Sequence, residues 1–131
     1  MKKKGILNAE LMRCIASLGH KDLFMIGDAG MPIPEGVEVI DLALCGGVPG
    51  FKQVLDAVLA ETEVEYYYLA DEIRDKNGDL YQHITDALPG VEYEMMPHVD
   101  LKAESAKCRF AVRTGEFSPF ANVILRAGVV F

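Results

Sequence analysis

Short apolar runs and helical apolar patterns alternate along the whole chain. Runs typical of buried strands occupy residues 23–26, 37–44, 66–70, 108–112 and 122–125, and the alternating pattern at 91–95 predicts a further strand. Apolar residues recur at helical spacing within 11–18, 54–59 and 80–88, and a shorter helix is expected near 101–106. The alternation predicts a layered αβα domain with a largely parallel, mixed sheet of about six strands. With 131 residues, no internal repeat and no linker, the chain is expected to form one domain over residues 1–131.

Polar residues at the ends of these elements are the first functional candidates. Asn8 is expected to cap the first helix, and Gly19 to follow its C-terminus in the left-handed conformation, which places His20 just beyond the helix end. Asp28 follows the strand at 23–26, and open α/β sheets bind ligands at the carboxyl edge of their strands. His20 precedes Asp28 by eight residues, a spacing that would allow the two side chains to converge. The alternative for His20 is a surface histidine that stabilises a helix C-terminus.

The other histidines and one polar loop supply further candidates. His98 follows a proline at a strand end and is equally consistent with a site and with the surface, whereas His83 is predicted to be solvated on a helix. A bare connection between strands would not need the many hydrogen-bonding side chains found at 113–122, and binding residues concentrate in such loops. Phe117 and Phe120 belong either to the core or to an aromatic face that could stack on the C–H face of a sugar. The polar side chains of the loop are Arg113, Thr114, Glu116, Ser118 and Asn122.

Composition narrows the partners and the compartment. The formal net charge of −7 disfavours nucleic acid and anionic membrane as partners. The three lysines at 2–4 do not indicate a signal peptide, because only a short apolar stretch follows them. No run has the length of a signal peptide's apolar core or of a membrane-spanning helix. The three cysteines are odd in number and form no Cys-x-x-Cys pair, so free thiols in a reducing cytoplasm are expected.

Motifs for several other chemistries are missing from the sequence. The histidines lack metal-ligand spacing such as His-x-x-x-His, so no metal is expected. Residues 46–50 are glycine-rich but match neither the dinucleotide fingerprint nor the P-loop, and a plain turn is favoured over a phosphate cradle. No Gly-x-Ser-x-Gly supplies a nucleophile. Acid–base catalysis by a histidine remains as a candidate mechanism, since histidine titrates near neutral pH.

Four blocks of the sequence resemble the ribose pyranase / fucose mutarotase family, and the resemblance covers essentially the whole chain. The last block is the most specific, and it is similar to the ribose branch rather than to the fucose branch. The blocks are KKGILN at 3–8, LGH at 18–20, DAGMPIP at 28–34 and RTGEFSPFAN at 113–122.

The resemblance implies an enzyme that interconverts the β-pyranose and furanose forms of free D-ribose without a cofactor. It also implies a large homo-oligomer, a decamer or an octamer, with sites near the subunit contacts. Ring opening and closing requires one group that donates a proton and another that removes one, which suits general acid–base catalysis. Two other functions stay open at this point: a non-catalytic sugar-binding or regulatory module of a ribose transport system, and mutarotation of another sugar such as L-fucose.

The resemblance also assigns roles to individual residues. His20 matches the family's proton donor, and Glu116 is a candidate second base. The substrate-binding tripeptide of the family usually begins with tyrosine, whereas this chain has Phe120, so one side-chain hydroxyl is missing. The positions that match substrate-binding residues are Asp28, His98, Phe120, Ala121 and Asn122.

Overall fold

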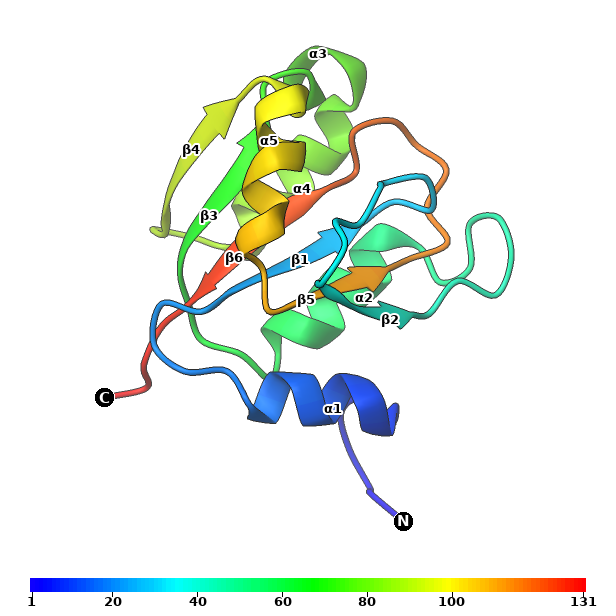
Figure 1. Ribbon diagram of the computed structural model, residues 1–131, viewed down its shortest axis with the longest axis vertical. Helices are drawn as coiled ribbons and strands as arrows, with labels where there is room; N and C mark the ends of the chain where they lie inside the picture. The colour runs from blue at the N-terminus through cyan, green and yellow to red at the C-terminus, as the bar shows by residue number, and fades with distance from the viewer.

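A single mixed sheet of six strands organises the computed structural model, which describes all residues from 1 to 131 (Figure 1). The strand order is β2-β5-β1-β6-β3-β4. Strand β6 pairs antiparallel with both β1 and β3, and every other pairing is parallel. The strands are β1 (Leu23–Gly27), β2 (Glu38–Asp41), β3 (Val64–Ala70), β4 (Glu92–Met96), β5 (Phe110–Arg113) and β6 (Val123–Ala127).

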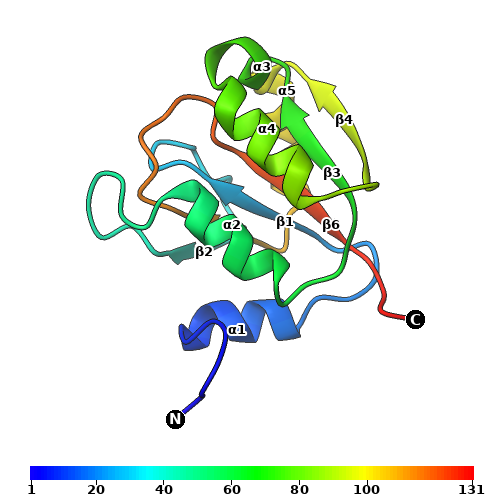
Figure 2. The ribbon, with the colours of Figure 1, turned by 180° about the vertical axis from the view of Figure 1, so that it is seen from behind.

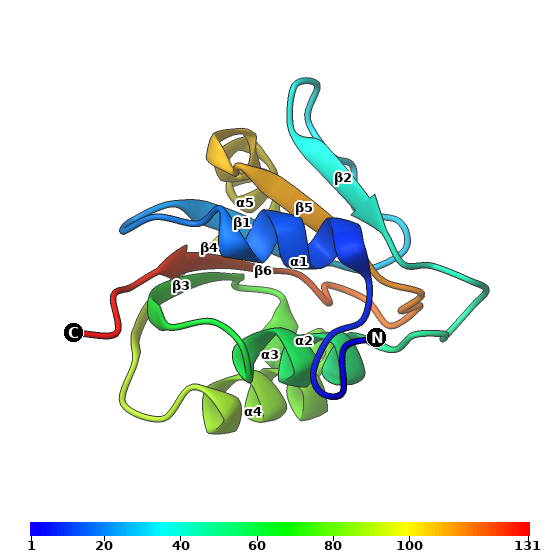
Figure 3. The ribbon, with the colours of Figure 1, turned by 90° about the horizontal axis from the view of Figure 1, so that it is seen from below.

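Helices cover both faces of this sheet. Helices α2 (Phe51–Leu59), α3 (Ile73–Lys76) and α4 (Gly78–Ala87) lie on one side and α5 (His98–Glu104) on the other, as the view from below shows (Figure 3). Helix α1 (Ala9–Ala16) lies beside α2 (Figure 2), and a short 3₁₀ turn, Ser105–Lys107, follows α5. The three-layer αβα prediction with six mixed strands is therefore confirmed, although one layer consists mainly of a single short helix.

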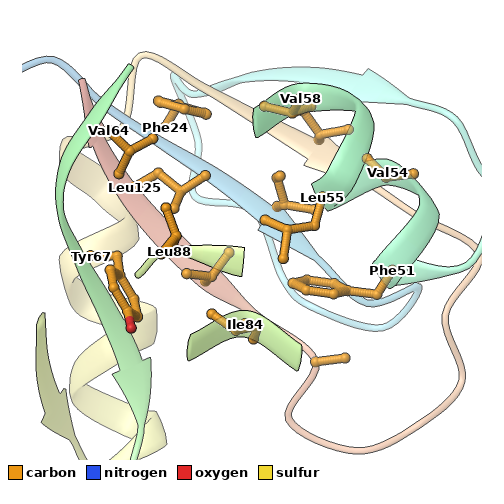
Figure 4. Close-up of a cluster of buried hydrophobic side chains, with 14 of the residues drawn as sticks. Phe24, Phe51, Val54, Leu55, Val58, Val64, Tyr67, Ile84, Leu88 and Leu125 are labelled. Atoms are coloured by element: carbon orange, nitrogen blue, oxygen red, sulfur yellow. The ribbon is translucent and has the colours of Figure 1, made fainter. Parts of the chain in front are cut away.

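Alternating side chains of the strands fill two cores. Phe24 and Ile26 of β1 point toward α1, α2 and α4, where they join Phe51 and Tyr67 in the larger cluster (Figure 4). Met25, between them, points to the opposite face and packs in the smaller cluster beneath α5. Burial on both faces explains why β1, β5 and β6 read as continuous apolar runs, whereas the edge strands β2 and β4 are more polar and more exposed.

The turn after α1 differs from the sequence-based expectation. Asn8 caps the helix as predicted, accepting from the Leu11 N–H at 2.9 Å. The helix ends at Ala16, however, and Lys21 rather than Gly19 takes the left-handed conformation, with φ of 70°. The reason is Asp22, whose carboxylate accepts from the Gly19 N–H at 2.7 Å and builds a separate turn. No helix has the length and hydropathy of a membrane span.

Candidate functional site at the carboxyl edge of the sheet

The end of β1 and the start of β6 form one polar site. Asp28 follows β1 directly and Asn122 precedes β6, and the two positions meet because β6 runs antiparallel to β1. The buried Asn122 donates from Nδ2 to Asp28 Oδ2 at 2.9 Å and accepts from the Asp28 N–H at 3.0 Å. The other carboxylate oxygen of Asp28 accepts from the Gly30 N–H at 3.0 Å. The Asp28 carboxylate is therefore held in one orientation.

Gly27 and Thr114 bring the loop close to the end of β1. A Cβ at Gly27 would lie 2.9 Å from Asn122 Oδ1, so only glycine permits this approach. Thr114 is fully buried, and its Oγ1 donates to the Gly27 carbonyl at 2.8 Å. The Ala29 N–H donates to the Glu116 carbonyl at 2.9 Å. These bonds fix the loop that carries Asn122 to the strand that carries Asp28.

Glu116 closes the N-terminus of α2. Its Oε1 accepts from the Phe51 N–H at 3.0 Å, and its Oε2 lies 3.3 Å from the Ser118 N–H. Burial opposes ionisation, but the backbone N–H groups outweigh it and lower the pKa of the Glu116 carboxyl. A carboxylate of the chain itself thus occupies the helix end at which a phosphate would bind, so the glycine-rich segment before α2 is a turn, as predicted.

A cleft of about 420 Å³ opens beside Asp28. Small-molecule sites typically measure roughly 300–1,000 Å³, so the cleft is of suitable size for a small polar ligand. Phe117 at this cleft is 77% exposed and does not belong to the core. The lining residues are Asp28, Ala29, Gly30, Glu116, Phe117, Ser118 and Pro119.

His98 and Phe120 contact each other next to the Asp28–Asn122 pair. His98 is the first residue of α5, and its ring meets the Phe120 ring edge to face, with centroids 5.1 Å apart. Phe120 has a φ of +56°, a left-handed conformation that is unfavourable for an aromatic residue and that is often found at ligand sites. Asn77 holds the chain there, since its Nδ2 donates to Ser118 Oγ and to the Pro119 carbonyl, both at 2.9 Å.

The surroundings of His98 favour its neutral form. Burial lowers the pKa of the imidazole, the Lys102 ammonium lowers it further, and the Glu72 and Asp28 carboxylates oppose the shift without reversing it. Both oxygens of Glu72 accept from the His98 backbone N–H, at 3.0 and 3.2 Å. Because Nδ1 of His98 is buried without a partner, the ring keeps hydrogen-bonding capacity that the chain does not use.

His20 lies at the opposite edge of the sheet from Asp28. It precedes β1 and Asp28 follows it, so a five-residue strand separates them; at roughly 3.3 Å per residue this is at least about 13 Å. Its half-exposed ring places Nε2 2.9 Å from Glu65 Oε2. The expectation that His20 and Asp28 converge is therefore wrong within one chain, because an intervening strand holds its two ends apart.

Most of the residues predicted to bind substrate lie close together in the structure, but the residues that support them were not predicted. The structure brings together Asp28, His98, Phe120 and Asn122, with Glu116 in the adjacent wall. The side chain of Ala121 is buried in the larger core, and Phe120 is partly buried against that core. His83 was predicted to be solvated, but its side chain is only 29% exposed and pairs with Asp56 of α2 at 2.8 Å. Glu65, Glu72 and Asn77 were not foreseen as supports. Each acts on a residue at least 26 positions away in the sequence, and no local pattern shows such a contact.

A polar and aromatic site at the carboxyl edge of a mainly parallel sheet defines an α/β protein that binds a small polar ligand. The chain matches the RbsD / FucU transport protein family over residues 1–130, and it belongs to that family. It is 50% identical over 131 residues to a protein of Limosilactobacillus fermentum named D-ribose pyranase, with 100% of both chains covered.

Two solved structures have the same fold. Bacillus subtilis RbsD complexed with D-ribose superposes with a TM-score of 0.96 at 40% identity, over 100% of both chains. The fucose mutarotase of Streptococcus pneumoniae, in complex with L-fucose, gives a TM-score of 0.76 at 24% identity over 95% of both chains, a likeness of fold alone.

Proposed function

We propose that this chain interconverts the β-pyranose and furanose forms of free D-ribose by general acid–base catalysis, with no cofactor. The observation that carries the proposal is the full-length 50% identity to a relative named D-ribose pyranase. The oriented Asp28–Asn122 pair and the neutral His98 support it, because they offer a sugar both acceptors and donors of hydrogen bonds.

In this proposal the cluster at the carboxyl edge binds the sugar. The Asp28 carboxylate accepts from a sugar hydroxyl, and the neutral imidazole of His98 exchanges a hydrogen bond with another. The ring of Phe120 offers an apolar face, the backbone of Ala121 adds hydrogen-bonding groups, and the buried Asn122 side chain takes part by holding the Asp28 carboxylate. His20 delivers the proton to the departing ring oxygen.

His20 must come from a second copy of the chain if it serves a sugar bound at Asp28. The strand between the two residues prevents them from reaching one small molecule within one subunit. We therefore propose a homo-oligomer, a decamer or an octamer, in which His20 of one subunit completes the site of its neighbour. The free thiols and the net charge of −7 support a cytoplasmic protein that does not act on nucleic acid or anionic membranes.

Magnetisation-transfer NMR on free D-ribose tests the proposed activity directly. The protein should accelerate exchange between pyranose and furanose signals, and His20→Ala should slow this by about 10²–10⁴-fold while ribose affinity changes little. Exchange no faster than in buffer, with ribose still bound, would instead indicate a non-catalytic binding module. Faster exchange with L-fucose than with D-ribose would indicate a mutarotase of a different sugar.

Mixing two inactive variants tests the shared site. His20→Ala subunits keep an intact Asp28, and Asp28→Ala subunits keep an intact His20. If each site takes these residues from different subunits, random reassembly of equal amounts restores about a quarter of the sites. A mixture that reassembles and stays inactive would refute the assignment of His20 to the neighbour's site.

A further inference from the structure

We propose that Glu65 is a positioning residue for His20: it keeps the ring proton on Nε2 and leaves Nδ1 as the nitrogen that exchanges a proton with the sugar. The inference rests on the proposed function for its catalytic consequence. Its structural part, the fixed tautomer of His20, is independent of that function and can be measured separately.

A β-bulge aims Glu65 at His20. In the pairing of β3 with β6, Val64 lies opposite Ala127 and Tyr66 lies opposite Arg126, so Glu65 is the extra residue on β3. Bulges of this kind redirect a side chain out of the regular alternation. The redirected carboxylate places Oε2 2.9 Å from His20 Nε2.

The charge state of Glu65 determines the tautomer of His20. The hydrogen bond from His20, with its positive field and that of Arg126, lowers the pKa of the Glu65 carboxyl despite some burial cost. The ionised carboxylate can only accept hydrogen bonds, so Nε2 of His20 must carry the proton between them. Arg126 holds the second oxygen, with Nε 2.9 Å from Oε1, and its guanidinium lies 4.7 Å above the Tyr66 ring.

The backbone around His20 is also fixed, so the imidazole ring is the part that Glu65 controls. The Gly19 N–H donates to Asp22 at 2.7 Å, and the Lys21 N–H donates to the Ala127 carbonyl at 2.8 Å. The His20 side chain is 48% exposed, so one side of the ring stays open to a ligand from outside the subunit. A ring bound through Nε2 and open elsewhere presents Nδ1.

In ring opening and closure, each proton that one group loses is taken up by another. Nδ1–H of the His20 imidazolium protonates the ring oxygen as the bond between that oxygen and the anomeric carbon breaks. The anomeric hydroxyl loses its proton to a base, and the open-chain aldehyde forms. Closure on another hydroxyl reverses these transfers, and His20 regains its proton. Throughout, the other ring proton stays on Nε2 and is donated in a hydrogen bond to Glu65, which orients the ring as the carboxylate of a hydrolase triad orients its histidine.

The tautomer can be read from ring ¹⁵N shifts, since the chain has only three histidines. The wild-type protein should show His20 protonated at Nε2 in its neutral form, with the signal assigned by its loss in His20→Gln. Glu65→Ala should give a mixture of tautomers, and Glu65→Gln an intermediate result. A neutral His20 of the wild type protonated mainly at Nδ1 would overturn the proposal without any Glu65 variant.

Kinetics of the oligomeric enzyme give the second readout. Glu65→Ala should lower kcat by about 10–10²-fold, the usual effect of removing a partner that orients a functional histidine, with KM within about twofold. Asp56→Ala is the matched control, since it breaks the similar His83–Asp56 pair away from the site and should leave kcat unchanged.

A double variant separates positioning from general stability. If Glu65 acts only through His20, Glu65→Ala should cause no further loss of kcat in the His20→Ala background. A further loss there, or a kcat for Glu65→Ala within twofold of wild type, would overturn the inference. If the wild type fails to accelerate ring exchange, the proposed function fails, and the ¹⁵N shifts still decide whether Glu65 fixes the tautomer.

Discussion

The Asp28–Asn122 pair makes a sharp prediction for Asn122→Asp. The substitution keeps the size of a fully buried side chain and keeps an oxygen to accept from the Asp28 N–H. It replaces the Nδ2 donor, which lies 2.9 Å from Asp28 Oδ2, by a carboxyl oxygen. Two carboxylates at this separation cannot both stay ionised, as in other paired carboxyl groups.

The loss of stability is set by whichever costs less free energy: keeping both carboxylates ionised, or protonating one of them. Repulsion of two unit charges at this separation is on the order of 6 kcal/mol at an effective dielectric of about 20. Taking up one proton at pH 7 costs about 4 kcal/mol, because an aspartate carboxyl ordinarily titrates about three units lower. Protonation therefore prevails, and the variant should be about 4 kcal/mol less stable at pH 7. The deficit should shrink by about 1.4 kcal/mol for each pH unit below that.

Urea unfolding at a fixed protein concentration, at about pH 7 and about pH 5, measures the deficit. The swap Asp28→Asn with Asn122→Asp should recover most of the stability, because a donor again faces a carboxylate across the same contact. Equal stability of wild type and Asn122→Asp at both pH values would refute the reasoning. A deficit that does not shrink on acidification, or that the swap leaves unchanged, would do the same.

Three further substitutions test other parts of the site. Because the pKa of His98 is lowered in the folded protein, its contribution to stability is full above the ordinary histidine range and is lost as pH falls through the folded pKa. His98→Gln should therefore lose less stability than wild type between about pH 7.5 and about pH 5.5 in urea unfolding; an equal loss would contradict the shift. Phe120→Tyr should be tolerated and should tighten ribose binding in calorimetry, because it adds the side-chain hydroxyl that the family resemblance implies at this position; collapse of the fold would place Phe120 in the core instead. Glu116→Gln keeps an acceptor for the Phe51 N–H, so kcat should fall less than about tenfold, whereas a loss of about 10²-fold or more would identify Glu116 as the second base.

The fold was predictable because its signals are local. The inner strands contain short apolar runs, and the alternation of strands and helices is enough to predict a layered sheet. The end of α1 was predicted less well, because Asp22 builds a turn that Gly19 alone does not show. The direction of β6 was also hidden, since an antiparallel strand buried on both faces has the same apolar pattern as a parallel one.

The site was predictable only in part, for a related reason. Asp28 and Asn122 were placed by their position at strand ends and by the resemblance of the two blocks that contain them. The pairing of Asp28 with Asn122 joins residues 94 positions apart, and the contact of Glu65 with His20 depends on a bulge. Such contacts arise from the three-dimensional register of the sheet, which spacing in the sequence does not reveal.

Strand β6 constrains how this protein can acquire new sugar preferences. It begins beside Asn122 at one edge of the sheet, and near its other end it carries Arg126, which holds Glu65. The residues between, Val123, Ile124 and Leu125, have no exposed surface on either face. A substitution at any position of β6 would disturb either a hydrophobic core or the contact that supports Glu65. Divergence toward other sugars is therefore expected in the part of the loop that lines the cleft, at Phe117, Ser118 and Pro119, where a changed side chain reshapes the cleft and leaves the sheet intact.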